Sequence, residues 1–180
     1  MDKNFYATTV ILYCKALKYR IAGMNENDDY IVYDSLEELD EESQWLVSKA
    51  QEALETSYSP YSNFTVGAAA LLNNSEVVLG ANQENASYPA GLCAERVALF
   101  QAGARFPNAA VIRLAVVAKR ANEENLRAGG PCGMCRQVML EFEQKFNLPY
   151  EVIFRIEEGK WVKTKSAHIL LPFSFGKRNL

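Results

Sequence analysis

The sequence lacks any block of five basic residues, and its positive charges are scattered along the chain. It therefore gives only a weak indication of a polyanion-binding surface, and we expect no nucleic-acid partner. It also lacks an apolar run long enough to cross a bilayer near its start, since the stretch over residues 6–17 is short and is interrupted by Lys15. No basic leader precedes that stretch, because Asp2 cancels Lys3, so neither a secretory signal nor a membrane association is expected.

Cysteine is scarce, and four cysteines in 180 residues do not suggest a disulfide framework. A reducing, cytoplasmic setting is the simplest interpretation. Cys14 stands alone in an apolar segment, where we expect a small buried side chain. The other three, Cys93, Cys132 and Cys135, fall in two short runs that need a separate explanation.

The net charge of -3 hides an asymmetry. Residues 25–42 contain nine acidic and no basic side chains, so the rest of the chain has 19 basic against 13 acidic residues, a remainder of +6. A hydrophobic content of 49% and a length of 180 residues are typical of one globular domain. We expect residues 1–34 to be an N-terminal extension of unknown role, added as a sheet edge or an oligomer contact, and residues 35–180 to form the main domain.

Hydrophobic periodicity predicts helices that alternate with strands. The predicted helices cover residues 40–56 and 93–104 and begin again near residue 135. The predicted strands cover residues 5–13, 30–33, 64–72, 77–79, 111–118, 151–156 and 161–163, before a tail that includes residues 169–175. This order predicts an α/β protein, a three-layer α/β/α sandwich with a mixed central sheet.

The three clustered cysteines and one glutamate organise the rest of the chain. Residues 80–96, GANQENASYPAGLCAER, supply Cys93 and Glu95, and residues 131–136, PCGMCR, supply Cys132 and Cys135. Three sulfurs can hold three corners of a tetrahedral Zn²⁺ and leave the fourth for water. Both runs lie at predicted helix starts, where backbone N–H groups stabilise thiolates. Glu95 would then be placed to move protons beside the water.

Three thiolates around one Zn²⁺ leave a net charge of -1, which weakens the metal as a Lewis acid. A neighbouring cation would offset that charge, and Arg96 and Arg136 are both adjacent in sequence. Either arginine could equally be an ordinary surface residue. The alternative for the sulfurs is three buried free cysteines.

The pair of runs resembles the zinc-deaminase signature in its three-cysteine form. The chain is similar to the homotetrameric cytidine deaminases over roughly residue 39 to the C-terminus. The motifs that carry this resemblance are Tyr61-Ser62-x-Phe64-x-Val66-Gly67-Ala68, Asn82-x-Glu84-Asn85-Ala86, Cys93-Ala94-Glu95-Arg96, Cys132-Gly133-x-Cys135-Arg136-Gln137 and Leu171-Pro172-x-x-Phe175.

This resemblance implies hydrolytic deamination of cytidine and 2'-deoxycytidine to the uridines with release of ammonia. It implies that Cys93, Cys132 and Cys135 bind Zn²⁺, whose activated water attacks C4 of the cytosine ring. Glu95 would take a proton from the water and deliver protons to N3 and to the departing amine. Arg96 would offset the charge of the cysteine ligands, whereas Arg136 matches no assigned role.

The resemblance also implies a set of substrate contacts. Asn82 and Glu84 match the positions that hold the ribose, and residues two apart on an extended segment point the same way. Phe64 matches a ring that lines the base pocket, and Ala94 is a further expected substrate contact. Phe175 matches an aromatic residue that reaches the site of a neighbouring subunit in a homotetramer.

Two segments depart from the family pattern. The residues before the helix at residue 40 exceed the family's short form, and residues 119–130 are polar and unmatched, so they could reshape the rim of the pocket and the nucleoside preference. The single histidine, His168, does not occupy the ligand position at Cys93, and we interpret it as structural.

Three alternatives remain open from the residues. A nucleic-acid-editing deaminase is supported only by the +6 remainder. A deaminase of a cytosine-like antibiotic would leave the pair Asn82 and Glu84 without a purpose. A protein with structural zinc would need a fourth protein ligand, for which Cys14 is the candidate.

Overall fold

The computed structural model describes residues 29–180. Its strands are β1 (Tyr30–Tyr33), β2 (Phe64–Leu72), β3 (Val77–Ala81), β4 (Val111–Arg120), β5 (Glu151–Arg155) and β6 (Trp161–Thr164). Its α-helices are α2 (Glu41–Ala53), α3 (Ala94–Arg105) and α4 (Gly133–Phe146). The predicted strand over residues 5–13 and the prediction for Cys14 lie outside the described residues.

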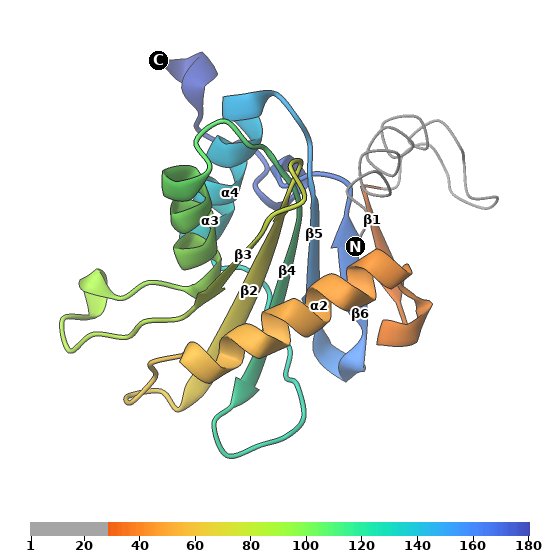
Figure 1. Cartoon of the computed structure of the whole chain (residues 1–180), viewed down its shortest axis with the longest axis vertical. Coiled ribbons are helices and arrows are strands. Elements are labelled where there is room, and N and C mark those ends of the chain that lie inside the picture. The colour runs from red at the N-terminus through yellow and green to blue at the C-terminus, as the bar shows by residue number, and fades with distance from the viewer. Residues whose placement is uncertain (1–28) are drawn as a thin grey trace.

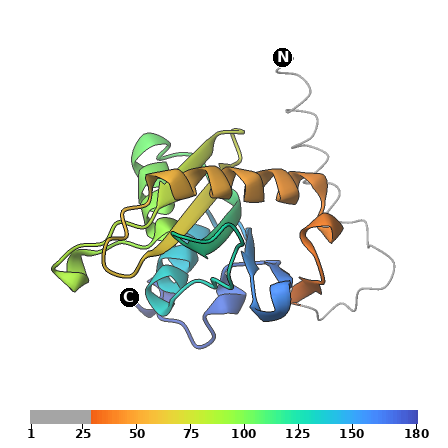
Figure 2. The same cartoon turned by 90° about the horizontal axis from the view of Figure 1, so that it is seen from below.

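The six strands form one sheet in the order β1-β6-β5-β4-β2-β3. Helix α2 crosses one face of this sheet, and α3 and α4 lie side by side on the other (Figure 1). The view from below separates the same layers, with the sheet between α2 and α4 (Figure 2). The predicted three-layer α/β/α sandwich is therefore confirmed.

The direction of the strands determines where the helices begin. In the described sheet β4 and β5 are parallel and the other neighbouring pairs are antiparallel, so the sheet is mixed. Because β3 and β4 each pair antiparallel with β2, their carboxyl ends lie at the same edge of the sheet. Helix α3 follows β3, and α4 follows β4. The N-termini of both helices, with their unpaired backbone N–H groups, therefore meet at that edge.

The apolar residues of the sheet pack against the helices in two clusters. The cluster under α3 and α4 includes Ala98, Leu99, Met139, Val116 and Phe154. The cluster under α2 includes Leu46, Val47, Ala69, Ala115 and Ile153. Because neighbouring residues of a strand face opposite sides, the continuous apolar runs of β2 and β4 supply both clusters.

Two glycines allow the helices to approach the sheet closely. A Cβ at Gly67 on β2 would lie 2.1 Å from the carbonyl oxygen of Ala50 on α2. A Cβ at Gly80 on β3 would lie 2.4 Å from the backbone nitrogen of Ala98 on α3. Any larger residue at these two positions would therefore push a helix away from the sheet.

Several predicted boundaries differ from the observed ones. Strand β4 continues past the apolar run to Arg120, because Lys119 and Arg120 still pair with Thr65 and Phe64 of β2. Helix α4 begins at Gly133 with Cys132 as its N-cap, two residues before the predicted start. The apolar stripe that marks this helix begins only at Cys135, because the first residues of the helix lie at the sheet edge rather than over the core.

The predicted strand at residues 30–33 is present as β1, which pairs with β6 at the edge of the sheet. Those residues thus contribute to the main sheet, although they precede the expected boundary at residue 34, which stays a prediction. Within residues 29–180, no helix combines the length and the apolar character that a membrane span requires.

A buried arginine links α2 to the sheet on the face opposite α3 and α4. Arg113 on β4 is 3% exposed, and its guanidinium is 2.9 Å from Asp40, the N-cap of α2. The same guanidinium lies 3.1 Å from Glu42 and 2.6 Å from Glu151, and Lys163 is 2.7 Å from Asp40. Although burial opposes ionisation, the hydrogen bond from Lys163 and the charge of Arg113 hold the pKa of Asp40 well below its ordinary value of 3.8.

Candidate metal centre and adjoining pocket

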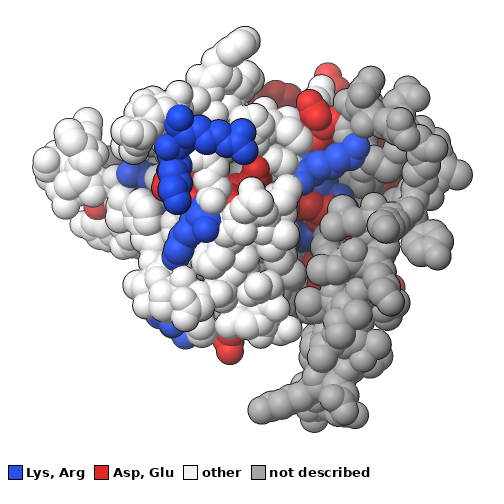
Figure 3. Space-filling view, turned by 90° about the horizontal axis from the view of Figure 1, so that it is seen from above, with Lys and Arg blue, Asp and Glu red and all other residues white. Residues whose placement is uncertain are grey.

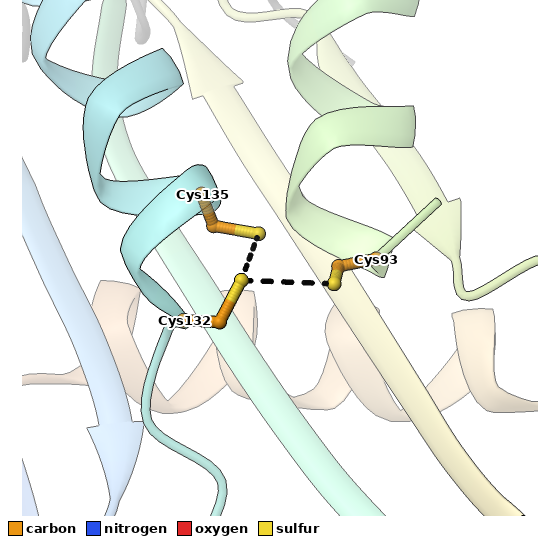
Figure 4. A group of neighbouring side chains, drawn as sticks. All are labelled: Cys93, Cys132 and Cys135. Carbon is orange, nitrogen blue, oxygen red and sulfur yellow. Dashed lines mark hydrogen bonds between the residues drawn. The ribbon is translucent and has the colours of Figure 1, made fainter. Parts of the chain in front are cut away.

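Three sulfurs converge where the N-termini of α3 and α4 meet. Cys93 is the N-cap of α3, Cys132 is the N-cap of α4, and Cys135 lies in the first turn of α4. Their side chains point toward one another (Figure 4), with 3.9 Å between the Sγ atoms of Cys93 and Cys132 and 3.5 Å between those of Cys132 and Cys135. All three sulfurs lie within 4.8 Å of one another.

These separations fit a tetrahedral Zn²⁺ site. Two sulfurs that bind one Zn²⁺ at about 2.3 Å with tetrahedral angles are about 3.8 Å apart. The observed separations of 3.5 and 3.9 Å bracket that value. Among the described residues this is the one group of cysteine, histidine or acidic side chains with metal-ligand spacing, and a fourth protein ligand is not part of it. Three ligands and one free position are typical of a catalytic rather than a structural zinc.

Hydrogen bonding between the sulfurs shifts the pKa values of Cys93 and Cys135 in opposite directions. The hydrogen bond from Cys135 is the main reason why the pKa of Cys93 falls to about 5, and Arg96 lowers it further. The same bond, together with burial, raises the pKa of Cys135. Cys93 therefore ionises more readily than Cys135, and a bound cation would favour the ionised form of its ligands.

Of the two arginines beside the cysteines, only one faces the sulfurs. Hydrogen bonding to Cys93 and the charges of Cys93 and Cys135 raise the pKa of Arg96, although burial opposes this. Its Nη2 donates to the carbonyl of Gly91 at 3.1 Å. Arg136 instead donates from Nε and Nη1 to the carbonyls of Pro131 and Leu170.

A buried carboxylate accompanies the sulfurs. Glu95, in the first turn of α3, is 4% exposed, and its Oε2 has no hydrogen-bond partner among the described residues. Burial is the largest cause that raises its pKa, to about 7, and the charge of Cys93 adds to it. A buried carboxylate oxygen without a partner is costly, so a position next to a metal and its ligands accounts for it better than a helix cap does.

A cavity of about 600 Å³ opens onto this group. Cys93, Cys132, Glu95 and Arg96 form one end of it. Its apolar wall includes Phe64, Val66, Val116 and Ala118, and its polar rim includes Asn82 and Glu84. The volume is within the range of small-molecule sites, and an apolar wall with few polar groups is typical of them.

The two polar rim residues differ in how much of their hydrogen bonding is already used. Asn82 is 8% exposed, and its Oδ1 accepts from Ser57 Oγ at 2.6 Å and from the backbone N–H of Val66 at 2.8 Å. Its Nδ2 donates to the carbonyl of Phe64 at 2.9 Å, which leaves one N–H of the amide for a ligand. The N–H of Val66 and the carbonyl of Phe64 fix which end of this amide faces the cavity, and Ser57 adds a second bond to Oδ1. The sequence motifs did not single out Ser57.

Glu84 closes a turn across the rim of the cavity. Its Oε2 accepts from the backbone N–H groups of Tyr61 and Ser62, at 2.9 and 3.2 Å. A hydrogen bond from the Ser62 side chain is the main reason why the pKa of Glu84 lies below its ordinary value. Glu84 is therefore an ionised acceptor that the turn holds in place. The rings of Tyr61 and Tyr88 meet edge to face beside it, 6.1 Å apart.

The unmatched segment over residues 119–130 does contribute to the cavity. It folds back along β4, where the N–H of Arg127 donates to Ala118 O at 2.7 Å. The N–H of Gly129 donates to Arg155 O, and Gly129 and Gly130 line the cavity wall. The expectation that this segment shapes the pocket therefore has a structural basis in two glycines.

Two expected substrate contacts, Ala94 and Phe175, lie away from the cavity of their own chain, and so does His168, which we interpreted as structural. The side chain of Ala94 is fully buried in the core below α3. Phe175 is 60% exposed on the segment after β6 and does not belong to the lining of this cavity. His168 is exposed in a short 3-10 turn and is not part of the sulfur group, while its structural role stays a prediction.

Fold and site together define a class of protein: an α/β sandwich in which two helix N-termini present three thiolates and a buried carboxylate to a pocket of small-molecule size. A sequence model of the family described as "Cytidine and deoxycytidylate deaminase zinc-binding region" matches residues 40–148. The chain belongs to this family, its metal is Zn²⁺, and it is a zinc-dependent deaminase.

Individual relatives agree with this assignment. The chain is 48% identical over 98 residues to a cytidine deaminase of Halalkalibacterium halodurans, covering 54% of this chain and 70% of that protein. It is 38% identical over 138 residues to a cytidine deaminase of Sporosarcina psychrophila, covering 75% and 92%. The crystal structure of a cytidine deaminase from Burkholderia pseudomallei superposes with a TM-score of 0.62 at 38% identity, covering 76% of this chain and all of that one.

Proposed function

We propose that the chain catalyses the hydrolytic deamination of cytidine and 2'-deoxycytidine, which consumes water, releases ammonia and leaves uridine or 2'-deoxyuridine. The observation that carries this proposal is the unpartnered Oε2 of Glu95 beside three convergent sulfurs, in the lining of a nucleoside-sized cavity. Relatives that match this chain over most of their own length are named cytidine deaminases, and this supports the same reaction.

In this proposal Cys93, Cys132 and Cys135 bind Zn²⁺ through their Sγ atoms. When bound, Zn²⁺ supplies a Lewis acid and lowers the pKa of a coordinated water from 15.7 toward about 7. Arg96 offsets the surplus negative charge of three thiolates, which its position beside Cys93 and Cys135 supports.

Glu95 has the role of proton carrier. Conversion of the amine to the carbonyl adds water at C4 and expels ammonia, so one proton must move to ring N3 and another to the departing nitrogen. A single carboxylate can perform both transfers when it lies beside both the water and the base. Oε2 of Glu95 is buried next to the sulfurs and has no competing partner among the described residues, which supports this role.

Asn82 and Glu84 are proposed to bind the sugar. A sugar hydroxyl both donates and accepts, so it can accept from the remaining N–H of Asn82 and donate to the carboxylate of Glu84. Among the described residues that line the cavity, Arg96 carries the only positive charge, and it faces the sulfurs. A 5'-phosphate at the rim would meet Glu84 instead of a cation, which favours nucleosides over nucleotides.

The base would lie against Phe64, and Ala94 would contribute its backbone N–H at the start of α3, because its side chain is buried in the core. Phe175 would complete the cavity of a neighbouring copy in a cytoplasmic homotetramer. Its exposure and its place outside the cavity of its own chain support this assignment.

The substitution Glu95→Gln tests the proposal. The variant should bind zinc as well as the parent but lose turnover by about three orders of magnitude or more, since general acid–base catalysis supplies 10²–10⁴. Zinc stoichiometry and the decrease in cytidine absorbance measure the two properties on one sample. Glu52→Gln, on the exposed side of α2, is the matched control. Unchanged turnover in Glu95→Gln would remove the proton-carrier role.

Two other functions can be tested against this one. On the face shown in Figure 3, the Lys and Arg side chains of the described residues lie apart on a largely uncharged surface, some of them beside acidic side chains, so this face offers little support for a nucleic-acid-editing deaminase. A shift of single-stranded RNA in a gel would favour that alternative. A structural zinc bound by Cys14 would be indicated if Cys14→Ser lost its metal.

A further inference from the structure

Arg136 connects the metal centre to the end of the chain. It follows Cys135 in the first turn of α4, and its Nε donates to the carbonyl of Pro131 at 2.8 Å. Pro131 is buried and directly precedes Cys132. From the same guanidinium, Nη1 donates to the carbonyl of Leu170 at 3.2 Å. The side chain of Arg136 therefore bonds both to the residue before Cys132 and to Leu170, which lies 34 positions further along the chain.

The rest of α4 holds the same part of the chain, residues 166–180, which we call the C-terminal segment. Gln137 donates from Nε2 to the carbonyl of Phe175 at 2.9 Å. Glu143 accepts from the N–H of Ala167 at 2.7 Å, and Gln144 accepts from the N–H of Lys177 at 3.2 Å. Residues 136, 137, 143 and 144 recur at intervals of about two turns, so they lie along one face of the helix.

Each of these bonds ends on a backbone group, and Glu143 also accepts from the Ser166 hydroxyl, so α4 positions chiefly the backbone path of the C-terminal segment. Arg136 differs from the other three α4 residues, because it alone also bonds to the loop that enters the helix at Cys132. A displacement of the segment at Leu170 therefore pulls on the group that positions Cys132.

We propose that Arg136 is a positioning residue that couples the zinc-binding loop to the C-terminal segment. It keeps Cys132 in register with Cys93 and Cys135, and it holds the segment that carries Phe175. The proposal rests on the proposed zinc ligands, but it requires neither the deamination reaction nor the neighbouring copy. It also differs from charge compensation, which Arg96 provides by facing the sulfurs.

The geometry of the guanidinium separates these two roles. Nε and Nη1 of Arg136 donate in different directions to two carbonyls, which the rigid fork of arginine allows. A lysine would keep the positive charge, but its single ammonium on a flexible stem cannot hold both carbonyls in the same way. Arg136→Lys should therefore behave like Arg136→Gln if the residue is a clamp, and like the parent protein if only its charge matters.

The experiment uses the full-length, zinc-loaded protein and its variants Arg136→Gln and Arg136→Lys. Zinc release to a chromogenic chelator reports on the loop, and amide hydrogen exchange over the C-terminal segment reports on the tail. Both variants should release zinc about tenfold faster, the lower end of the effect of removing a group that orients a metal ligand. Both should also show faster exchange in the C-terminal segment. Arg178→Gln, an exposed arginine of the same segment, should match the parent protein in both measurements.

A second variant approaches the coupling from the other side. Gln137→Ala removes the bond to Phe175 and leaves Arg136 in place, so it should speed exchange in the segment and raise the rate of zinc release two- to threefold. It also serves if the Arg136 variants fold poorly.

The proposal is overturned if Arg136→Lys matches the parent protein in both zinc release and hydrogen exchange. It is also overturned if zinc release rises in the variants while hydrogen exchange in the C-terminal segment is unchanged in all of them. A parent protein that binds no zinc would instead contradict the assignment of the ligands, which keeps the two failures apart.

Discussion

The two ends of the cavity are built in different ways. At the sulfur end, every group lies at the first residues of a helix whose position is set by the packed sheet: Cys93 and Glu95 on α3, Cys132 and Cys135 on α4. At the sugar end, Asn82 and Glu84 come after the end of β3, and bonds to Ser57, Tyr61 and Ser62 hold them. The proposed catalytic groups are thus positioned by core packing, whereas the proposed sugar contacts are positioned by individual hydrogen bonds.

This contrast predicts that substitutions at the sulfur end act on metal binding and turnover together. Cys132→Ser should lose nearly all bound zinc and reduce kcat by about four orders of magnitude or more, because Zn²⁺ supplies the activated water. Metal analysis and the cytidine assay on the purified variant test this. Removal of zinc from the parent protein by a chelator should have the same effect, and added zinc should reverse it. Full activity without bound zinc would contradict the assignment.

At the sugar end the expected effect is smaller and falls on the substrate. Glu84→Ala should raise KM for cytidine about a hundredfold, since hydrogen bonds to charged groups contribute about 1.5–3 kcal/mol. Free cytosine has no ribose, so its deamination should change little. Steady-state kinetics with both substrates decides the matter, and equal losses on the two would exclude a sugar contact. Zinc content should stay that of the parent protein.

A still smaller effect is expected for a residue that acts only through Asn82. Ser57→Ala removes one of two bonds to Asn82 Oδ1 and leaves the bond from Val66. The loss of about 1 kcal/mol should raise KM for cytidine about fivefold and leave kcat unchanged. Ser48→Ala, an exposed serine on α2, is the control. A lower kcat at constant KM would place Ser57 in the chemistry rather than in binding.

A substitution away from both ends of the cavity should change only the free energy of unfolding of the protein. Asp40→Asn keeps an N-cap for α2 but removes the charge that faces Arg113 and Lys163, and it should reduce the free energy of unfolding at pH 7 by about 1 kcal/mol. The folded-state pKa of Asp40 is depressed, so its contribution is present above pH 4 and disappears as pH falls through that pKa. Urea unfolding at pH 7 and pH 3 should show a difference between the two proteins that shrinks at pH 3. A constant difference would mean that the charge is not responsible.

The same contrast explains what the sequence predicts well. Alternating and helical periodicity indicated the described strands and helices and the three layers, because burial in the sheet imposes those periods. The spacing of Cys93, Glu95, Cys132 and Cys135 indicated the sulfur end, because helix starts are local features that short motifs record. Strand ends were less predictable, since β4 continues through Lys119 and Arg120 by backbone pairing that carries no apolar signal.

Contacts between distant parts of the chain left no such record. Ser57 and Asn82 are 25 positions apart, and Arg136 and Leu170 are 34 apart. In each pair one partner, Ser57 or Leu170, lies outside the motifs, so the spacing within a motif does not record the contact. The segment over residues 119–130 was expected at the rim of the pocket, but nothing in the sequence singled out the glycines at residues 129 and 130 within it. Sequence motifs thus identified most of the residues that line the two ends of the cavity, but not those that hold them in place.

Gly80 shows how far the control of a metal can lie from its ligands. Thirteen positions before Cys93, this residue lets α3 rest against β3 with no side chain between them. A single methyl group there would lift the helix, and the first sulfur would travel with it while the other two stayed on α4. We therefore expect a substitution at Gly80 to weaken zinc binding, although this residue lies outside the group of sulfurs.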